Sequence, residues 1–154
     1  TMPGPLPTLE WLHICDYAFR DEQGKLCMIG LFDSLHSVNL PGRLPIFSVA
    51  IGLTDGKGSY EVGLRIEAPG GTAVDLQLPP VQLADRRAKA RAVIRLASLP
   101  FEEFGTYTFR LILEGQPVDA PVHLLEHLQL QGGGPEVPGV RGPGLPPPPD
   151  FPQG

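Results

Sequence analysis

The sequence predicts an all-β protein, an antiparallel sandwich of two sheets with about eight strands. Two observations support this prediction. Apolar side chains recur at every second position in several short runs, which is the period of a strand with one buried face. Gly and Pro, with 19 residues of each among 154, separate these runs. Hairpins that follow one another along the chain also fit a barrel, and this alternative stays open.

The first three strands are predicted over residues 9–20, 25–35 and 46–54. The first two form a hairpin, because Gly24 lies where a short hairpin loop needs positive φ. Pro45 interrupts the chain before the third strand. The third strand turns one row of side chains inward, namely Phe47, Val49, Ile51 and Leu53.

The middle of the chain contains three shorter predicted strands, over residues 60–66, 74–78 and 91–97. The sequence Asp55-Gly56-Lys57-Gly58 indicates a hairpin turn before the first of them. Between the second and the third, residues 85–91 are rich in Ala, Arg and Lys, which favours one or two helical turns. The fourth strand of the chain directs Tyr60, Val62, Leu64 and Ile66 inward.

The most regular alternation lies in residues 104–115, where four apolar side chains face the core: Tyr107, Phe109, Leu111 and Leu113. Gly105 and Tyr107 form a Gly-x-Tyr start that resembles the tyrosine corner of immunoglobulin-like sandwiches, in which a Tyr hydroxyl ties a strand to the preceding loop. A last strand is predicted over residues 118–128. The folded domain is therefore predicted over residues 8–130. Residues 131–154 are predicted to be a disordered tail, because Pro and Gly leave almost nothing to bury.

Composition narrows the classes of function. A formal net charge of −5 gives no general attraction to nucleic acid or to an anionic membrane, so neither is expected as a partner. The sequence shows no signal peptide and no apolar run long enough to span a bilayer, which favours a cytoplasmic protein. Cys15 and Cys27 are the only cysteines and lie on one predicted hairpin, so reduced, buried thiols are expected rather than a disulfide between sheets.

Two spaced motifs lie in the N-terminal hairpin: Cys15-Asp16-Tyr17-Ala18 and Ile29-Gly30-Leu31-Phe32-Asp33. Together with Gly105, Tyr107 and Gly115, they resemble a family of small uncharacterised bacterial proteins that carry C-D-Y-A and I-G-x-F-D signatures. The resemblance covers residues 8–128. It implies a small sandwich of the immunoglobulin or fibronectin type, and it implies no activity, so no functional residue is transferred.

Three groups of polar residues are candidate sites of chemistry. His123 and His127 share one side of a strand and, with His13 or Cys15, would make a weak metal site; two half-exposed surface histidines are favoured instead. Asp33, His36 and Ser37 lack the geometry of a nucleophile triad, and a polar strand end is favoured. The basic cluster of Arg86, Arg87, Lys89, Arg91 and Arg95 lacks aromatic neighbours, which favours a solvated loop. No cofactor is expected.

Asp16 and Asp33 each interrupt an apolar strand. Paired acids can perform general acid–base catalysis, but a structural role is favoured, in which each carboxylate accepts backbone N–H bonds. Residues 146–152 match a polyproline ligand, although a plain tail end is favoured.

The N-terminal hairpin is apolar on both faces, whereas a sandwich strand needs only one apolar face. The second face must be covered by another part of the chain, by a protein partner or by a second copy. The interaction surface is predicted at Leu12, Ile14, Cys27, Ile29 and Leu31. The sequence thus predicts a non-enzymatic protein-interaction or assembly module; the alternative is a sandwich that binds a small ligand or carbohydrate.

Overall fold

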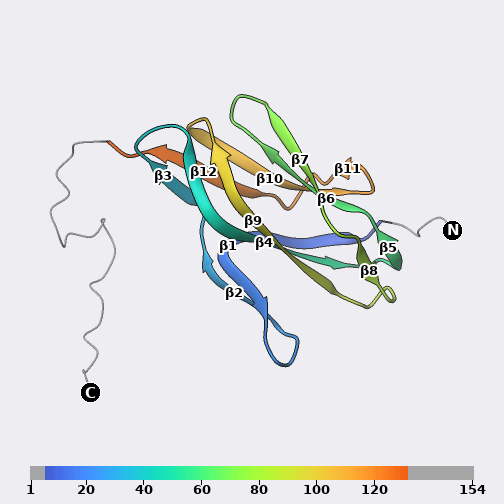
Figure 1. Cartoon of the computed structure of the whole chain (residues 1–154). Coiled ribbons are helices and arrows are strands. Elements are labelled where there is room, and N and C mark those ends of the chain that lie inside the picture. Colours follow the sequence, from blue (N-terminus) through green and yellow to red (C-terminus); the bar gives the residue numbers. More distant parts are fainter. Residues whose placement is uncertain (1–5, 132–154) are drawn as a thin grey trace, which may run out of the picture.

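The computed structural model describes residues 6–131, and within that range the chain is all-β with no helix (Figure 1). The predicted tail therefore lies outside the described residues, except for its first position. No helix in the described range is long and apolar enough to cross a membrane. The strands are β1 (Thr8–Arg20), β2 (Leu26–Leu31), β3 (Ser34–Ser37), β4 (Gly42–Thr54), β5 (Gly58–Tyr60), β6 (Val62–Glu67), β7 (Ala73–Gln77), β8 (Val81–Leu83), β9 (Ala90–Phe101), β10 (Gly105–Leu113), β11 (Gln116–Pro117) and β12 (His123–Gln129).

These strands form three sheets rather than the predicted two. A four-stranded sheet has the order β2-β1-β4-β9, and a six-stranded sheet has the order β3-β12-β10-β6-β7 with β11 beside β10. Strands β5 and β8 make a separate two-stranded sheet. One pair, β3 with β12, is parallel, so the prediction of purely antiparallel sheets is wrong at this point.

The count of about eight strands is too low for the described residues because predicted strands break where the chain changes sheet. The predicted strand over residues 25–35 ends at Leu31, and β3 then pairs with β12 in the other sheet. The expected helical turns between residues 85 and 91 are instead a turn after β8, where the Asp85 carboxylate accepts the N–H groups of Arg87 and Ala88.

The core lies between the four-stranded and six-stranded sheets. The predicted inward rows are confirmed, since every one of these side chains is buried: Phe47, Val49, Ile51, Leu53, Tyr60, Val62, Leu64, Ile66, Tyr107, Phe109, Leu111 and Leu113. Edge-to-face aromatic contacts hold the two sheets together, with the rings of Phe47 and Phe109 centred 6.2 Å apart.

The feature expected at Gly105 and Tyr107 is present. The backbone N–H of Glu103 donates to the Tyr107 hydroxyl at 3.0 Å, so this hydroxyl ties β10 to the loop that precedes it. Gly105 has a φ of 128°, and a Cβ there would lie 2.9 Å from the Pro69 ring. Glycine is therefore required at this position both for the backbone angle and for the close approach.

Candidate docking surface

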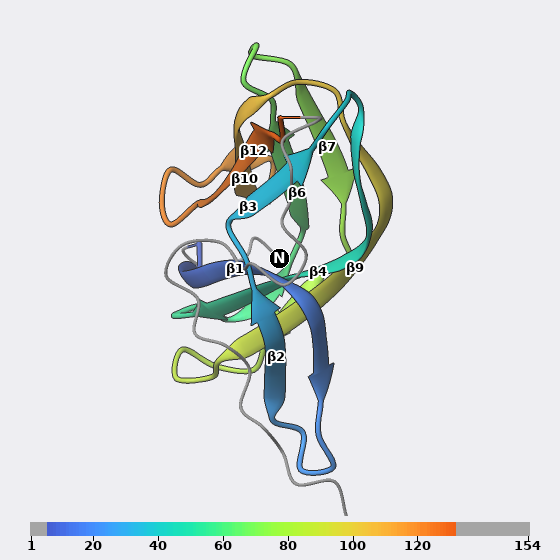
Figure 2. The same ribbon diagram turned by 90° about the vertical axis from the view of Figure 1, so that its left-hand side faces the viewer.

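The hairpin of β1 and β2 projects away from the other strands, as both ribbon views show (Figures 1 and 2). Its turn is stabilised by the Asp21 carboxylate, which accepts the N–H of Gln23 at 2.9 Å and that of Lys25 at 2.8 Å. Gly24 has a φ of 80°, which confirms the expected turn glycine. The turn sets the register of the two strands beyond it.

That register determines which side chains share the outer face of the hairpin. Tyr17 lies opposite Ile29, and Phe19 lies opposite Cys27. Because directly opposed residues of an antiparallel pair point to the same face, these side chains form one apolar row. Ile29 is 57% exposed and Tyr17 is 44% exposed.

Two further apolar side chains extend this outer row. Leu31, opposite Cys15 on the same hairpin, is 58% exposed, and Ile46 on β4 is 61% exposed. We define the docking surface as the row of Tyr17, Phe19, Cys27, Ile29, Leu31 and Ile46. Its exposed members are large hydrophobic residues gathered on one strand pair and its neighbour, which is how interaction patches differ from scattered surface hydrophobics.

Two residues of the predicted interaction surface do not belong to it. Leu12 is 3% exposed and Ile14 is fully buried, because both point inward and pack in the core between the sheets. The prediction was wrong for these two residues and combined opposite faces of the hairpin. Cys27, Ile29 and Leu31 do lie on the outer face.

The free edge of β2 is the second component of this surface. Strand β2 pairs with β1 on one side, and within the described residues it is the end strand of its sheet. Its sequence, Leu26 to Leu31, contains no charged residue and no proline. Natural edge strands usually carry charges, proline or strong bends that discourage pairing with another chain.

A cation lies beside the surface. The guanidinium carbon of Arg95 on β9 is 4.5 Å from the centre of the Tyr17 ring, a cation–π contact. This contact lies at the margin of the apolar row. Arg95 thus belongs to the outer face of the sheet, and the other predicted basic residues are not all free, since Lys89 pairs with Glu10 at 3.2 Å.

Asp16 and Asp33 are exposed, and among the described residues neither carboxylate makes the expected hydrogen bond to a backbone N–H. Asp16 has a different structural contact. Gly30, with a φ of 74°, lies so close that a Cβ there would meet the Asp16 Oδ2 atom at 2.4 Å. The Asp16 side chain therefore covers the backbone of Gly30 across the hairpin.

The two thiols differ in burial, and both are free cysteines. Cys15 is completely buried, and burial raises the pKa of its thiol. Cys27 is only partly buried and belongs to the docking surface. The expected reduced state fits both residues, but the expected burial holds only for Cys15.

His123 and His127 were expected to be half-exposed, and this is wrong for His127, which is 1% exposed. His127 Nδ1 lies 2.6 Å from the Glu103 carbonyl and therefore donates to it, while Nε2 lies 2.9 Å from the Ser37 hydroxyl and accepts from it. The ring of His123 contacts the Phe32 carbonyl at 3.0 Å, and burial lowers its pKa. No group of metal-ligating side chains occurs within residues 6–131.

The contact of Ser37 with His127 has the distances of a nucleophile and its base, with a carbonyl as the third member. The sequence places Asp33 and His36 near Ser37, whereas the partner in the structure is His127, which is distant in the sequence. The backbone of Gly42 covers the pair: a Cβ there would lie 2.3 Å from Ser37 Oγ and 2.4 Å from His127 Nε2. That side leaves no room for a substrate, so the pair joins β3 to β12.

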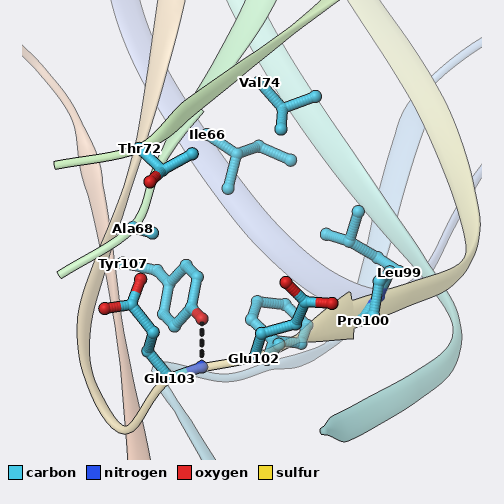
Figure 3. Close-up of a pocket in the computed structure, with 10 residues that line it drawn as sticks. Ile66, Ala68, Thr72, Val74, Leu99, Pro100, Glu102, Glu103 and Tyr107 are labelled. Carbon is cyan, nitrogen blue, oxygen red and sulfur yellow. Dashed lines mark hydrogen bonds between the residues drawn. The ribbon is translucent and has the colours of Figure 1, made fainter. Parts of the chain in front are cut away.

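A cavity of about 370 Å³ opens between β7 and β9, where the edges of the two larger sheets separate (Figure 3). Its walls are mainly apolar, and two acidic residues lie at one side. The lining residues are Ile66, Ala68, Thr72, Val74, Leu99, Pro100, Phe101, Glu102, Glu103 and Tyr107. The site cannot be recognised in the sequence, because its walls come from four separate strands and from the two loops that follow β6 and β9.

Within residues 6–131, the fold is all-β and the apolar strand β2 forms one edge of the four-stranded sheet. The chain belongs to a family of unknown function, DUF6941, whose characteristic sequence matches residues 10–122. This agrees with the predicted membership of an uncharacterised family. No curated protein matches the chain.

Proposed function

We propose that this protein is a non-enzymatic assembly module whose β2 edge and docking surface bind a second copy of the same chain. The observation that carries the proposal is the combination of an uncharged, unpaired edge strand with Ile29 and Leu31, each more than half exposed on it. Edge strands of this kind readily accept a further strand, and the backbone hydrogen bonds then continue the sheet.

A second copy fits this edge because β2 is compatible with itself. In a two-fold pairing, the same strand supplies both sides of the interface. Antiparallel pairing of two β2 strands brings no like charges together, since the strand has none. The apolar rows of the two copies then form one continuous face, and Ile29 and Leu31 lose exposed surface to each other, which stabilises the pair.

The test is the molar mass in solution, measured by light scattering across a wide dilution series. The account predicts a dimer that dissociates on dilution, and Ile29→Lys should weaken the dimer by at least about tenfold, because it places a charge on the paired edge. The matched control is Leu124→Lys, since Leu124 on β12 is 50% exposed but lies on the other sheet. A monomer at every concentration, or equal effects of the two variants, contradicts the proposal.

The alternative, a sandwich that binds a small ligand or carbohydrate, stays a prediction. Sugar binding usually uses an aromatic ring laid open on a surface. The Trp11 ring stacks on His13 with centroids 5.6 Å apart and lies against Gly52, and the exposed Tyr17 ring already carries the Arg95 guanidinium. The observation that favours a ligand other than a sugar is the cavity beside Tyr107.

A further inference from the structure

We infer that the cavity between β7 and β9 is a binding site for a small amphipathic cation, an ammonium group attached to an apolar chain or ring. This site is distant from β2 in the fold, and its function does not depend on assembly. Nothing in the family description assigns it. The inference rests on the walls of the cavity, on its unpaired acids and on its size.

The walls are suited to an apolar body. Ile66 and Tyr107 are almost fully buried and form the inner wall, while Val74 on β7 is 52% exposed at the mouth. The opposite wall is the end of β9, where Ser98 has a φ of 56° and Pro100 cannot donate a backbone hydrogen bond. Pro100 therefore offers no backbone donor at this wall of the cavity, although β9 stays paired with β4 as far as Phe101.

Two acidic residues at the cavity also support the inference of a cation site. Figure 3 shows the carboxylates of Glu102 and Glu103 on either side of the Tyr107 ring. Among the described residues, neither forms an ion pair. Nearby acids are paired: Asp75 binds Arg65 at 2.8 Å, and Glu67 binds Arg110 at 3.1 Å.

A cation placed beside these carboxylates gains both charge attraction and contact with an aromatic ring. Two carboxylates flanking an aromatic ring attract an ammonium group and oppose an anion. The apolar walls favour a ligand whose remainder is hydrocarbon, because burying that surface stabilises the complex. The arrangement therefore selects against a neutral polar ligand as well as against an anion.

The size of the cavity restricts the class of ligand further. A volume of about 370 Å³ lies at the lower end of the range for small-molecule sites. One compact molecule fills such a space, and the open mouth allows it to enter without unfolding the sheets. We therefore assign the site to a small free amine rather than to a protein segment.

The experiment is an NMR titration of the full chain with three probes of similar shape: 2-phenylethylamine, 3-phenylpropanol and 3-phenylpropionate. The amine should shift the amide signals of residues 99–107 saturably, and its affinity should exceed that of the alcohol by about tenfold. The propionate should produce no saturable shift. Added salt should weaken binding of the amine and leave binding of the alcohol unchanged.

Variants test whether the two acids cause the preference for the amine over the alcohol. The double variant Glu102→Gln and Glu103→Gln should reduce amine affinity to that of the alcohol, while alcohol binding stays the same. The matched control is Glu22→Gln, an exposed acid in the hairpin turn, which should bind the amine as the unmodified chain does. Equal affinity for amine and alcohol, no saturable shift with the amine, or an unchanged amine affinity in the double variant would overturn the inference.

Discussion

Strands β2 and β9 are the two edges of the same four-stranded sheet, yet they differ in two features that discourage pairing, charged side chains and proline. Strand β9 carries Arg91 and Arg95, bends at Ser98 and contains Pro100. Strand β2 has no charge and no proline. Charge, bends and proline keep edges apart in natural sheets. This difference is what the proposed assembly requires: β9 carries charges and proline that discourage pairing, and β2 carries neither.

The two faces of the β1–β2 hairpin differ in burial. Ile14 on β1 is completely buried, whereas Ile29 on β2 is 57% exposed. Both are isoleucines on the same hairpin, so they allow burial to be compared with the residue type held constant.

Replacement of Ile14 by Ala should lower the free energy of unfolding by about 3 kcal/mol, because it removes buried methyl groups and leaves a cavity. Replacement of Ile29 by Ala should change it by less than about 0.5 kcal/mol at high dilution, where assembly contributes nothing. The measurement is chemical denaturation of both variants. Similar losses for the two would mean that Ile29 is buried within its own chain, against the proposed docking surface.

Replacement of Gly30 by Ala should cost about 2 kcal/mol, and Gly24→Ala about 1 kcal/mol. Both glycines have positive φ, which disfavours alanine in each case. At Gly30 the new methyl group must also displace the Asp16 carboxylate, while nothing lies within 4 Å of a Cβ at Gly24. Thermal unfolding measures the loss of stability in each variant. When Asp16 is also replaced by Ala, Gly30→Ala should cost only about as much as Gly24→Ala.

Alkylation should distinguish the two cysteines. In dilute protein, where a second copy does not cover it, Cys27 lies on the partly open outer face, whereas Cys15 is buried with a raised thiol pKa. Since only the thiolate reacts, Cys27 should be modified by iodoacetamide at least about tenfold faster at neutral pH. Raising the pH should narrow the difference. Mass spectrometry after proteolytic digestion quantifies alkylation at both cysteines. Equal alkylation rates would show that the hairpin opens as a unit.

The strands whose buried side chains the sequence predicted correctly are those with one apolar face. Strands β6 and β10 have this pattern, and in β4 large apolar residues alternate with mostly small ones, so the alternation identifies the buried row. The hairpin of β1 and β2 is apolar on both faces, and the pattern cannot then distinguish the inner face from the outer one. For this reason Leu12 and Ile14 were assigned to the surface, although the core covers them.

Long-range pairing explains the remaining differences. Strand β3 has four residues and finds its partner, β12, about ninety positions later in the chain. Nothing near Ser37 signals this pairing, so neither the parallel strands nor the burial of His127 was predicted. The cavity beside Tyr107 depends on where the edges of two sheets separate, which is likewise a property of the assembled fold.

The central claim is that the β2 edge binds a second copy of the chain. Amide hydrogen exchange, followed residue by residue at low and high protein concentration, tests it most directly. The account predicts that amides of Leu26 to Leu31 exchange more slowly as concentration rises, while those at the β9 edge do not change. Exchange of the β2 amides that is independent of concentration would contradict it.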